Sequence, residues 1–258
     1  TYIETENYGA GHARNVGLRE ATGKYIKFLD ADDTLFPDAV EVQVSQSASL
    51  SEGTITFGDA QYVREDGSLK KKTSFGPPEE NENRLLYILR RNVQTSLPLH
   101  RRHLLEAVGG FNEDLPRAQE FDLHFRLVVH GASFRYHPHP VTKILGRDSK
   151  DRISNQDHFS EDPKGRLRRI TQRAKMADKA GLLDDPLRQF LARGAWHAGR
   201  MALRSGFPTV AQEYFNKARS LHEKHIASSS RIYRWIVRLT SPVVAERMSA
   251  LVKGRSFG

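Results

Sequence analysis

The chain contains no cysteine among its 258 residues. A disulfide framework, a zinc site built from thiolates and a cysteine nucleophile are therefore excluded. No run of about 18 or more apolar residues occurs, so the sequence predicts no membrane-spanning helix. Residues 1–10 lack the basic start and the apolar run of a signal peptide, and we expect a cytoplasmic protein.

Several motifs with a known chemistry are also missing. The sequence has no P-loop, no Rossmann glycine fingerprint and no serine elbow. Its 11 histidines include two close pairs, His100 with His103 and His137 with His139. Neither pair comes with a clear third ligand, and we interpret these histidines as structural or exposed.

Charge is spread unevenly along the chain, whose net charge is +9. Residues 161–258 carry 20 Lys and Arg against 8 Asp and Glu, a net charge of +12, and residues 1–160 carry −3. This asymmetry suggests two regions with different partners. The basic region is either a solvated helical surface or a surface for an anionic partner. No nucleic-acid-binding motif occurs, so we expect no nucleic-acid partner.

The first half of the chain has the pattern of an α/β domain. Apolar residues recur there at helical spacing, or gather in β-branched and aromatic runs bounded by Gly, Pro and Asp. This pattern predicts helices over 9–21, 85–89 and 121–129, a helix starting near Pro37, strands over 24–29, 54–57 and 95–100, a hairpin over 61–72 that turns at Asp66–Gly67, and a tight turn at Gly109–Gly110.

From about Asp162 onward the pattern is helical only. Residues 187–203 and 211–221 each carry an apolar stripe, and Ser205–Pro208 separates them, which predicts an αα-hairpin. One such hairpin loosely resembles a single tetratricopeptide unit, but it does not make a repeat array. The last segment, 232–251, mixes apolar residues with arginine. It is interpreted either as a helix packed on the first domain or as a peripheral contact with the inner face of a membrane.

Three carboxylates, Asp30, Asp32 and Asp33, directly follow the apolar run at 24–29. Ligands of open α/β sheets bind beyond the carboxyl ends of strands. Clustered carboxylates repel one another unless a cation lies between them, and oxygen ligands on a tight turn suit Mg²⁺ or Mn²⁺. The alternative is that Asp33 or Thr34 caps the next helix, which would explain one of the three acids.

A second acidic site lies at Glu120, where a loop enters the helix expected over 121–129. Asp122 and Arg126 are four residues apart, so an ordinary helical ion pair explains them. Glu120 has no such local partner. It is either a functional carboxylate or an exposed first-turn acid favoured by the helix dipole.

Two stretches, NYGAGHARNVGL at 7–18 and ATGKYIKFLDADD at 21–33, resemble the family 2 glycosyltransferases of the A-type fold. Their pattern reads roughly N-x-G-x-x-x-A-R-N-x-G-L and A-x-G-x-Y-I-x-F-L-D-x-D-D. Residues 101–102, 108–113, 119–127 and 148–154 resemble later segments of the same family. The resemblance covers about residues 1–155, and it implies an A-type mixed sheet followed by an all-α C-terminal region.

The resemblance also implies a reaction and its residues. Asp33 would be the direct ligand of Mn²⁺ or Mg²⁺, with Asp32 beside it, and Asp30 would lie near the ribose or sugar of a nucleotide-sugar donor. Glu120 would be the base that deprotonates a glycan or lipid-linked acceptor, so that one displacement inverts the anomeric centre. Asp32 would also bind the donor substrate, and Gly109 and Gly110 would shape the acceptor side. Arg14 and Asn15 are candidate contacts of the donor phosphate, and packing or helix capping explains them about as well.

This chain departs from the family pattern in two ways. The family usually has Asp where Glu120 stands, and Glu is longer by one methylene group. The strand and D-D-G-S segment that hold the nucleotide in the family have no counterpart before the 7–18 motif. We therefore expect a partial, N-terminally truncated catalytic domain over 1–155, a basic helical region over 156–258, and, as an alternative function, an inactive or non-catalytic binding module.

Overall fold

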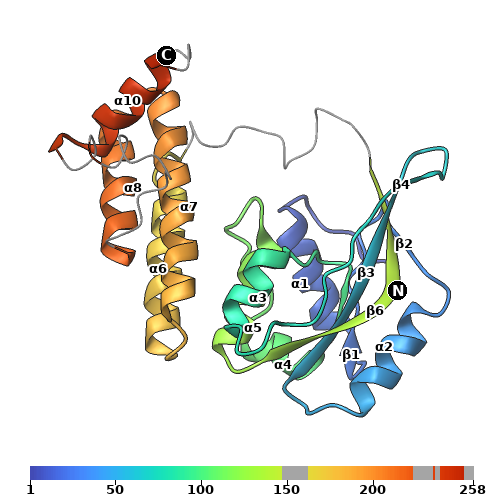
Figure 1. Cartoon of the computed structure of the whole chain (residues 1–258). Helices are drawn as coiled ribbons and strands as arrows, with labels where there is room; N and C mark the ends of the chain where they lie inside the picture. The colour runs from blue at the N-terminus through green and yellow to red at the C-terminus, as the bar shows by residue number, and fades with distance from the viewer. Residues whose placement is uncertain (147–161, 223–234, 236–238, 253–258) are drawn as a thin grey trace. The chain divides into compact units, whose positions relative to one another are not determined.

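The computed structural model describes residues 1–146, 162–222, 235 and 239–252. The chain divides into two compact units, Thr1–Asn155 and Gln156–Gly258 (Figure 1). The segment 148–154, which resembles the family, lies outside the described residues.

A six-stranded mixed sheet forms the centre of the first unit. Its order is β1-β5-β3-β6-β2, with β4 paired to β3. The strands are β1 (Tyr25–Ile26), β2 (Thr34–Leu35), β3 (Thr54–Val63), β4 (Leu69–Lys72), β5 (Pro98–Arg101) and β6 (Ser133–Leu145). Strands β3 and β6 run parallel and all other pairs are antiparallel. A mixed sheet is therefore present, as predicted.

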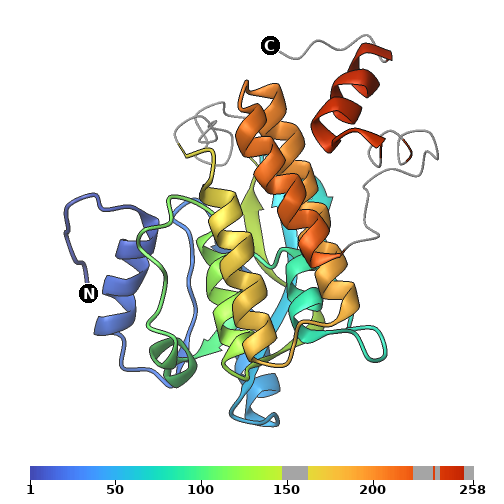
Figure 2. The same ribbon diagram turned by 90° about the vertical axis from the view of Figure 1, so that its left-hand side faces the viewer.

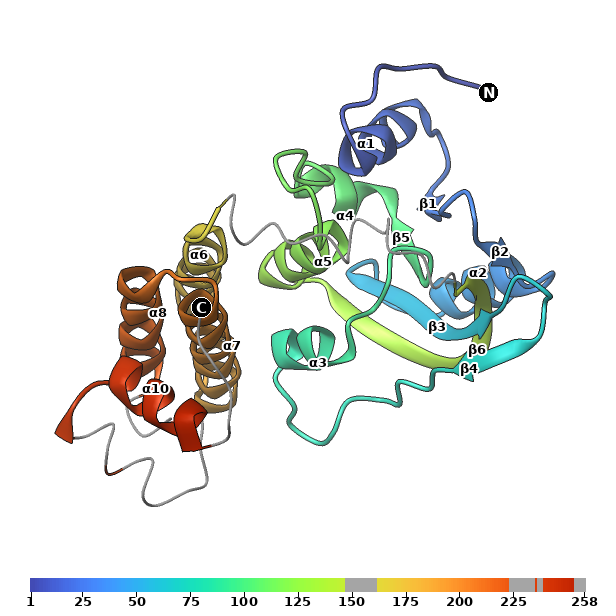
Figure 3. The same cartoon turned by 90° about the horizontal axis from the view of Figure 1, so that it is seen from above.

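Helices cover both faces of this sheet. They are α1 (Ala10–Glu20), α2 (Ala39–Ala48), α3 (Arg84–Arg91), α4 (Arg102–Ala107) and α5 (Gln119–Val129). Neighbouring residues of β3 point to opposite faces. The Thr56 hydroxyl contacts Ser47 of α2, whereas the Phe57 ring packs against Tyr87 of α3. Helices α2 and α3 consequently lie on opposite sides of the sheet (Figures 1 and 3).

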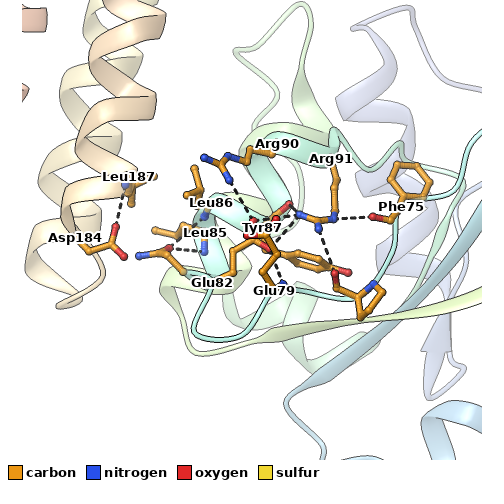
Figure 4. Close-up of polar contacts among 12 residues, drawn as sticks. Phe75, Glu79, Glu82, Leu85, Leu86, Tyr87, Arg90, Arg91, Asp184 and Leu187 are labelled. Carbon is orange, nitrogen blue, oxygen red and sulfur yellow. Dashed lines mark hydrogen bonds and ion pairs between the residues drawn. The ribbon is translucent and has the colours of Figure 1, made fainter. Parts of the chain in front are cut away.

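Arg91 fastens the loop after β4 to helix α3 (Figure 4). Its guanidinium donates to the carbonyls of Phe75 and Pro77 at 3.0 and 3.2 Å and to the carboxylate of Glu82 at 3.3 Å. The same guanidinium lies 3.9 Å from the centre of the Tyr87 ring. Phe75 in turn packs on Phe57 of β3, so this loop closes one side of the core.

Three strand predictions need correction. The strand expected over 24–29 pairs with β5 only through Tyr25 and Ile26, whereas Pro98 and Leu99 of β5 pair with β3. Residues 95–97 form a turn, closed by a hydrogen bond from Leu97 N to Gln94 O, and only 98–101 are strand. The strand expected over 54–57 extends to Val63 and continues into the predicted hairpin, whose turn at Asp66–Gly67 is confirmed.

The second unit is helical, as predicted. Its described helices are α6 (Gly165–Lys179), α7 (Asp185–Arg204), α8 (Pro208–Leu221) and α10 (Pro242–Val252). Asp184 caps α7 by accepting from the Leu187 amide at 2.9 Å (Figure 4). Helices α7 and α8 pack as the expected hairpin (Figure 2), and Gly199 allows the Phe215 ring to approach α7. No helix in the described part of the chain is long and apolar enough to span a membrane.

Candidate active site

The three aspartates lie on one turn between β1 and β2. The turn is closed by a hydrogen bond from Asp33 N to Asp30 O at 3.0 Å. Phe28, 8% exposed, anchors the chain immediately before it. The turn leaves Asp32 exposed and Asp33 partly buried, so their carboxylates experience different environments.

The Asp33 carboxylate is held by two donors from distant parts of the chain. The Ser96 hydroxyl donates to Oδ2 at 3.1 Å, and the Leu145 amide donates to Oδ1 at 3.4 Å. Burial, together with the neighbouring charges of Asp30 and Asp32, raises the pKa of Asp33 to about 6, although both hydrogen bonds oppose this rise. A partly buried carboxylate beside two others is an environment that a cation would relieve.

Helix capping does not explain Asp33 or Thr34. The residue at the N-cap of α2 is Asp38, five positions after Asp33 and four after Thr34, and its side chain makes no capping hydrogen bond. The helix expected near Pro37 begins at Ala39, after a turn. The capping alternative is therefore wrong.

Arg14 of α1 connects the aspartate turn to the start of α5. Its Nη2 donates to Asp30 Oδ1 at 2.6 Å, and its Nη1 donates to Gln119 Oε1 at 2.9 Å. The guanidinium also lies 5.3 Å from the centre of the Phe111 ring. Gln119 is itself held by donating from Nε2 to Leu115 O at 2.6 Å. The aspartate turn and the start of α5, which are far apart in the sequence, therefore both contact the Arg14 side chain.

The Asn15 side chain stabilises the tight turn predicted at Gly109–Gly110. Its Nδ2 donates to Phe111 O at 2.9 Å, and its Oδ1 accepts from Phe111 N at 2.8 Å. Gly109 and Gly110 adopt positive φ of 73° and 68°, and a Cβ on Gly110 would collide with the Asn15 side chain. The amide of Asn15 is therefore already engaged with the backbone, and its substrate role stays a prediction, as do those of the two glycines.

Glu120 lies in the first turn of α5, as the sequence predicted. The residue before the helix, Ala118, has a left-handed backbone with φ of 55°, a conformation that costs energy in a residue with a Cβ. Asp122 pairs with Arg126 at 2.7 Å, which confirms the helical ion pair. Glu120 is partly exposed, and its role as a base stays a prediction.

A cavity of about 680 Å³ opens between α1 and the segment 25–31. Its lining includes Ala13, Arg14, Gly17, Phe28, Leu29 and Asp30. This volume is in the range of small-molecule sites. Arg14 and Asp30 therefore line an opening that is large enough for part of a nucleotide sugar.

Asp32 and Asp33 suit a hard divalent cation, because both offer carboxylate oxygens and Asp33 lies among like charges. Among the described residues, no three carboxylate, imidazole or thiolate groups are arranged as a metal site. The carboxylate oxygens of these two residues fit Mn²⁺ or Mg²⁺. Water and substrate phosphate would supply the remaining ligands, as is usual for Mg²⁺.

Sequence reasoning missed Ser96, because a lone serine in a turn carries no motif. It also missed Lys27, which donates from Nζ to Gln43 Oε1 at 2.7 Å and to Leu97 O at 3.0 Å. Burial lowers the pKa of Lys27 to about 7. A lysine between the apolar residues Ile26 and Phe28 was the signal in the sequence that could have pointed to it.

Comparison with known proteins agrees with this architecture. The family model described as glycosyl transferase family 2 matches residues 1–109. An uncharacterized glycosyltransferase of Rickettsia felis is 32% identical over 131 residues, which are 49% of this chain and 22% of that protein. The amylovoran biosynthesis glycosyltransferase AmsB of Erwinia amylovora is 34% identical over 140 residues, 51% of this chain and 44% of that protein. The chain thus spans less than half of these relatives.

The crystal structure of S. aureus TarS 1-349 in complex with UDP-GlcNAc has a similar fold. It aligns with 100% of this chain and 76% of that chain, with a TM-score of 0.63 and 16% sequence identity. At this identity the likeness concerns the fold, which is the A-type mixed sheet with a helical C-terminal region. Residues 1–109, within the N-terminal unit, are thus similar to glycosyl transferase family 2.

Proposed function

We propose that the first unit, 1–155, transfers a sugar from a nucleotide-sugar donor to a glycan or lipid-linked acceptor, with inversion at the anomeric carbon. The observation that supports this most directly is the bridge made by Arg14, which links Asp30 to Gln119. It brings the aspartate turn and the residue next to Glu120 to one place. A displacement needs donor-binding groups and a base within reach of one acceptor oxygen.

In the proposed reaction, Glu120 accepts the proton of the acceptor hydroxyl as that oxygen attacks the anomeric carbon. The new glycosidic bond forms as the bond to the diphosphate breaks, and the nucleoside diphosphate leaves with the electron pair. Asp30, oriented by Arg14, faces the ribose or sugar of the donor. Mn²⁺ or Mg²⁺ held by Asp32 and Asp33 would offset the charge of the leaving diphosphate.

Release of nucleoside diphosphate tests this proposal without a known acceptor. A panel of UDP- and GDP-sugars is incubated with the protein and Mn²⁺, and the first sugar product is examined by NMR. We expect one donor to be hydrolysed, with initial release of the inverted anomer. Glu120→Gln should slow turnover by about 100-fold or more. Retention of configuration, or unchanged turnover in Glu120→Gln, would refute the assignment.

A non-catalytic binding module is the second candidate. It is favoured by Glu120, which stands where the family usually has Asp. Calorimetric titration with UDP and GDP, with and without Mn²⁺, separates the candidates. Metal-dependent nucleotide binding together with turnover supports the enzyme, whereas binding without turnover for every donor supports the module.

A peripheral contact with the inner face of a membrane is proposed for the second unit, 156–258. Large apolar side chains are exposed near its C-terminal end, at Trp235, Leu239, Val244 and Met248. Helix α10 is held to α7 through Glu246, which accepts from Trp196 Nε1 at 3.2 Å and from Arg200 Nε at 2.5 Å. Exposed apolar groups on a strongly basic unit suit an anionic interface.

Vesicle flotation tests the membrane contact. The protein should float with vesicles that contain anionic phosphatidylglycerol and should remain below vesicles of phosphatidylcholine. Trp235→Ser with Met248→Ser should lower the floated fraction, whereas Val40→Ser, a change at an exposed apolar residue of the first unit, should leave it unchanged. Flotation that does not depend on anionic lipid would rule the contact out.

A further inference from the structure

The loop between α3 and β5 presents one buried hydroxyl to the aspartate turn. Ser96 in this loop is 2% exposed, and its hydroxyl donates to Asp33 Oδ2. Ser96 and Asp33 are 63 residues apart in the chain, and no motif connects them. Their contact therefore arises only from the way the two loops meet.

The Ser96 backbone is fixed from both sides. Its carbonyl accepts from Thr142 Oγ1 of β6 at 2.7 Å, and Thr142 is fully buried. The next carbonyl, that of Leu97, accepts from Lys27 Nζ at 3.0 Å and from Gln43 Nε2 at 2.9 Å. A serine held in this way has little freedom to turn its hydroxyl elsewhere.

The three carboxylates of the turn differ in what holds them. Asp30 is paired with the cation of Arg14, and Asp32 is exposed. The recorded donors to Asp33 are the neutral Ser96 hydroxyl and the Leu145 amide. Neutral donors orient a carboxylate while leaving its negative charge available. Outer-shell hydrogen bonds of this kind orient the ligands of metal ions.

We propose that Ser96 is a positioning residue that orients Asp33 for a divalent cation. This inference rests on the proposed metal role of Asp33. Removing the hydroxyl leaves the carboxylate present but free to rotate, so the cation should bind more weakly without loss of the fold. Ser96 does not touch the cation or the reacting atoms in this proposal.

The test is a titration of the protein with Mn²⁺ alone, in which the EPR signal of free Mn²⁺ reports binding. Ser96→Ala should weaken Mn²⁺ binding about tenfold, and Ser96→Thr, which keeps the hydroxyl, should restore most of it. Ser47→Ala is the matched control, because Ser47 is also a buried serine, 1% exposed, and its hydroxyl contacts Thr56 instead of Asp33. Thermal unfolding of each variant verifies that it folds.

Asp33→Ala separates the two levels of the argument. If the wild type binds Mn²⁺ and Asp33→Ala does not, the metal role stands, and Ser96→Ala then decides the positioning role. Binding by Ser96→Ala within twofold of the wild type would overturn that role alone. Equal weakening in Ser96→Ala and Ser47→Ala would overturn it too, since the effect would then be a general loss of packing. Unchanged binding in Asp33→Ala, or no binding by the wild type, would overturn the metal role and the positioning role together.

Discussion

Arg14 Nη2 lies 2.6 Å from Asp30 Oδ1, and the same guanidinium reaches Gln119 with its other terminal nitrogen. The Arg14 side chain is 18% exposed, so this contact is shielded from water more than an ordinary surface ion pair. It is the point at which the helix that precedes the aspartate turn meets the helix that carries Glu120.

Arg14→Lys should therefore impair turnover of the donor although it keeps the charge. A lysine ammonium cannot span two acceptors as the planar guanidinium does. We expect a loss of about 100-fold in the rate of nucleoside diphosphate release, the scale of a displacement by about 1 Å. Arg19→Lys on the same helix, at an exposed position, should change the rate less than twofold, about 0.4 kcal/mol. Equal rates for Arg14→Lys and wild type would show that the bridge is not needed.

Glu120→Asp tests whether the site is built for the longer acid. The substitution keeps a carboxylate but withdraws it by one methylene group from the position that α5 sets. We expect the turnover rate to fall by about 10- to 100-fold, with less change in nucleotide affinity measured by calorimetry. A rate equal to or above that of the wild type would instead mean that Glu120 is not positioned as the base.

The buried histidine pair predicts acid sensitivity. The rings of His100 and His124 stack with centroids 5.6 Å apart. Burial lowers the pKa of His124 to about 3 and that of His100 well below its usual value. Both are neutral in the folded protein, so the unfolded state binds more protons once the pH falls below about 6.5. These two histidines therefore leave the free energy of unfolding unchanged above that pH, and they lower it progressively as the pH falls below it.

His124→Leu should reduce this acid sensitivity. It removes one of the two groups that take up a proton on unfolding. Between pH 6.5 and pH 5 the wild type should lose about 2 kcal/mol more unfolding free energy through His124 than the variant does. Urea unfolding at the two pH values measures the difference, and His130→Leu at an exposed position is the control. Parallel pH dependences in wild type and His124→Leu would contradict the prediction.

Two glycines of α7 should respond oppositely to alanine. A Cβ on Gly199 would lie 2.7 Å from the Phe215 ring, whereas a Cβ on Gly194 would meet nothing within 4 Å. Gly199→Ala should destabilise the helical unit by about 1–3 kcal/mol through overpacking. Gly194→Ala should stabilise it by up to about 1 kcal/mol through helix propensity. Fluorescence of Trp196, which packs on Phe215, reports the unfolding of this unit.

A stabilised Gly199→Ala variant would mean that Phe215 moves aside at little cost. The contact between α7 and α8 would then be looser than the packing of these two side chains implies. Similar effects of both substitutions would indicate that helix propensity outweighs packing throughout α7.

The strand that sequence reasoning missed, β6, shows the limit of local patterns. It is the longest strand of the described part of the chain, yet it contains Pro138 and Pro140, and proline argues against a central strand. The register between β3 and β6 shifts around Asp59, opposite this proline-containing stretch, so the two strands pair on either side of it. Whether a strand tolerates such a register shift depends on its partner strand, and the local sequence of β6 does not contain that information.

Local sequence patterns were sufficient to predict the features that depend on neighbouring residues. The aspartate turn after an apolar run, the start of α5 beside Glu120 and the α7–α8 hairpin all follow from local periodicity and turn residues. The side chains that hold those features in place are evident only in the folded chain. Ser96 reaches Asp33 across 63 residues, and Arg14 reaches Gln119 across 105. Such contacts depend on how the loops meet around the sheet, and local spacing carries no record of that.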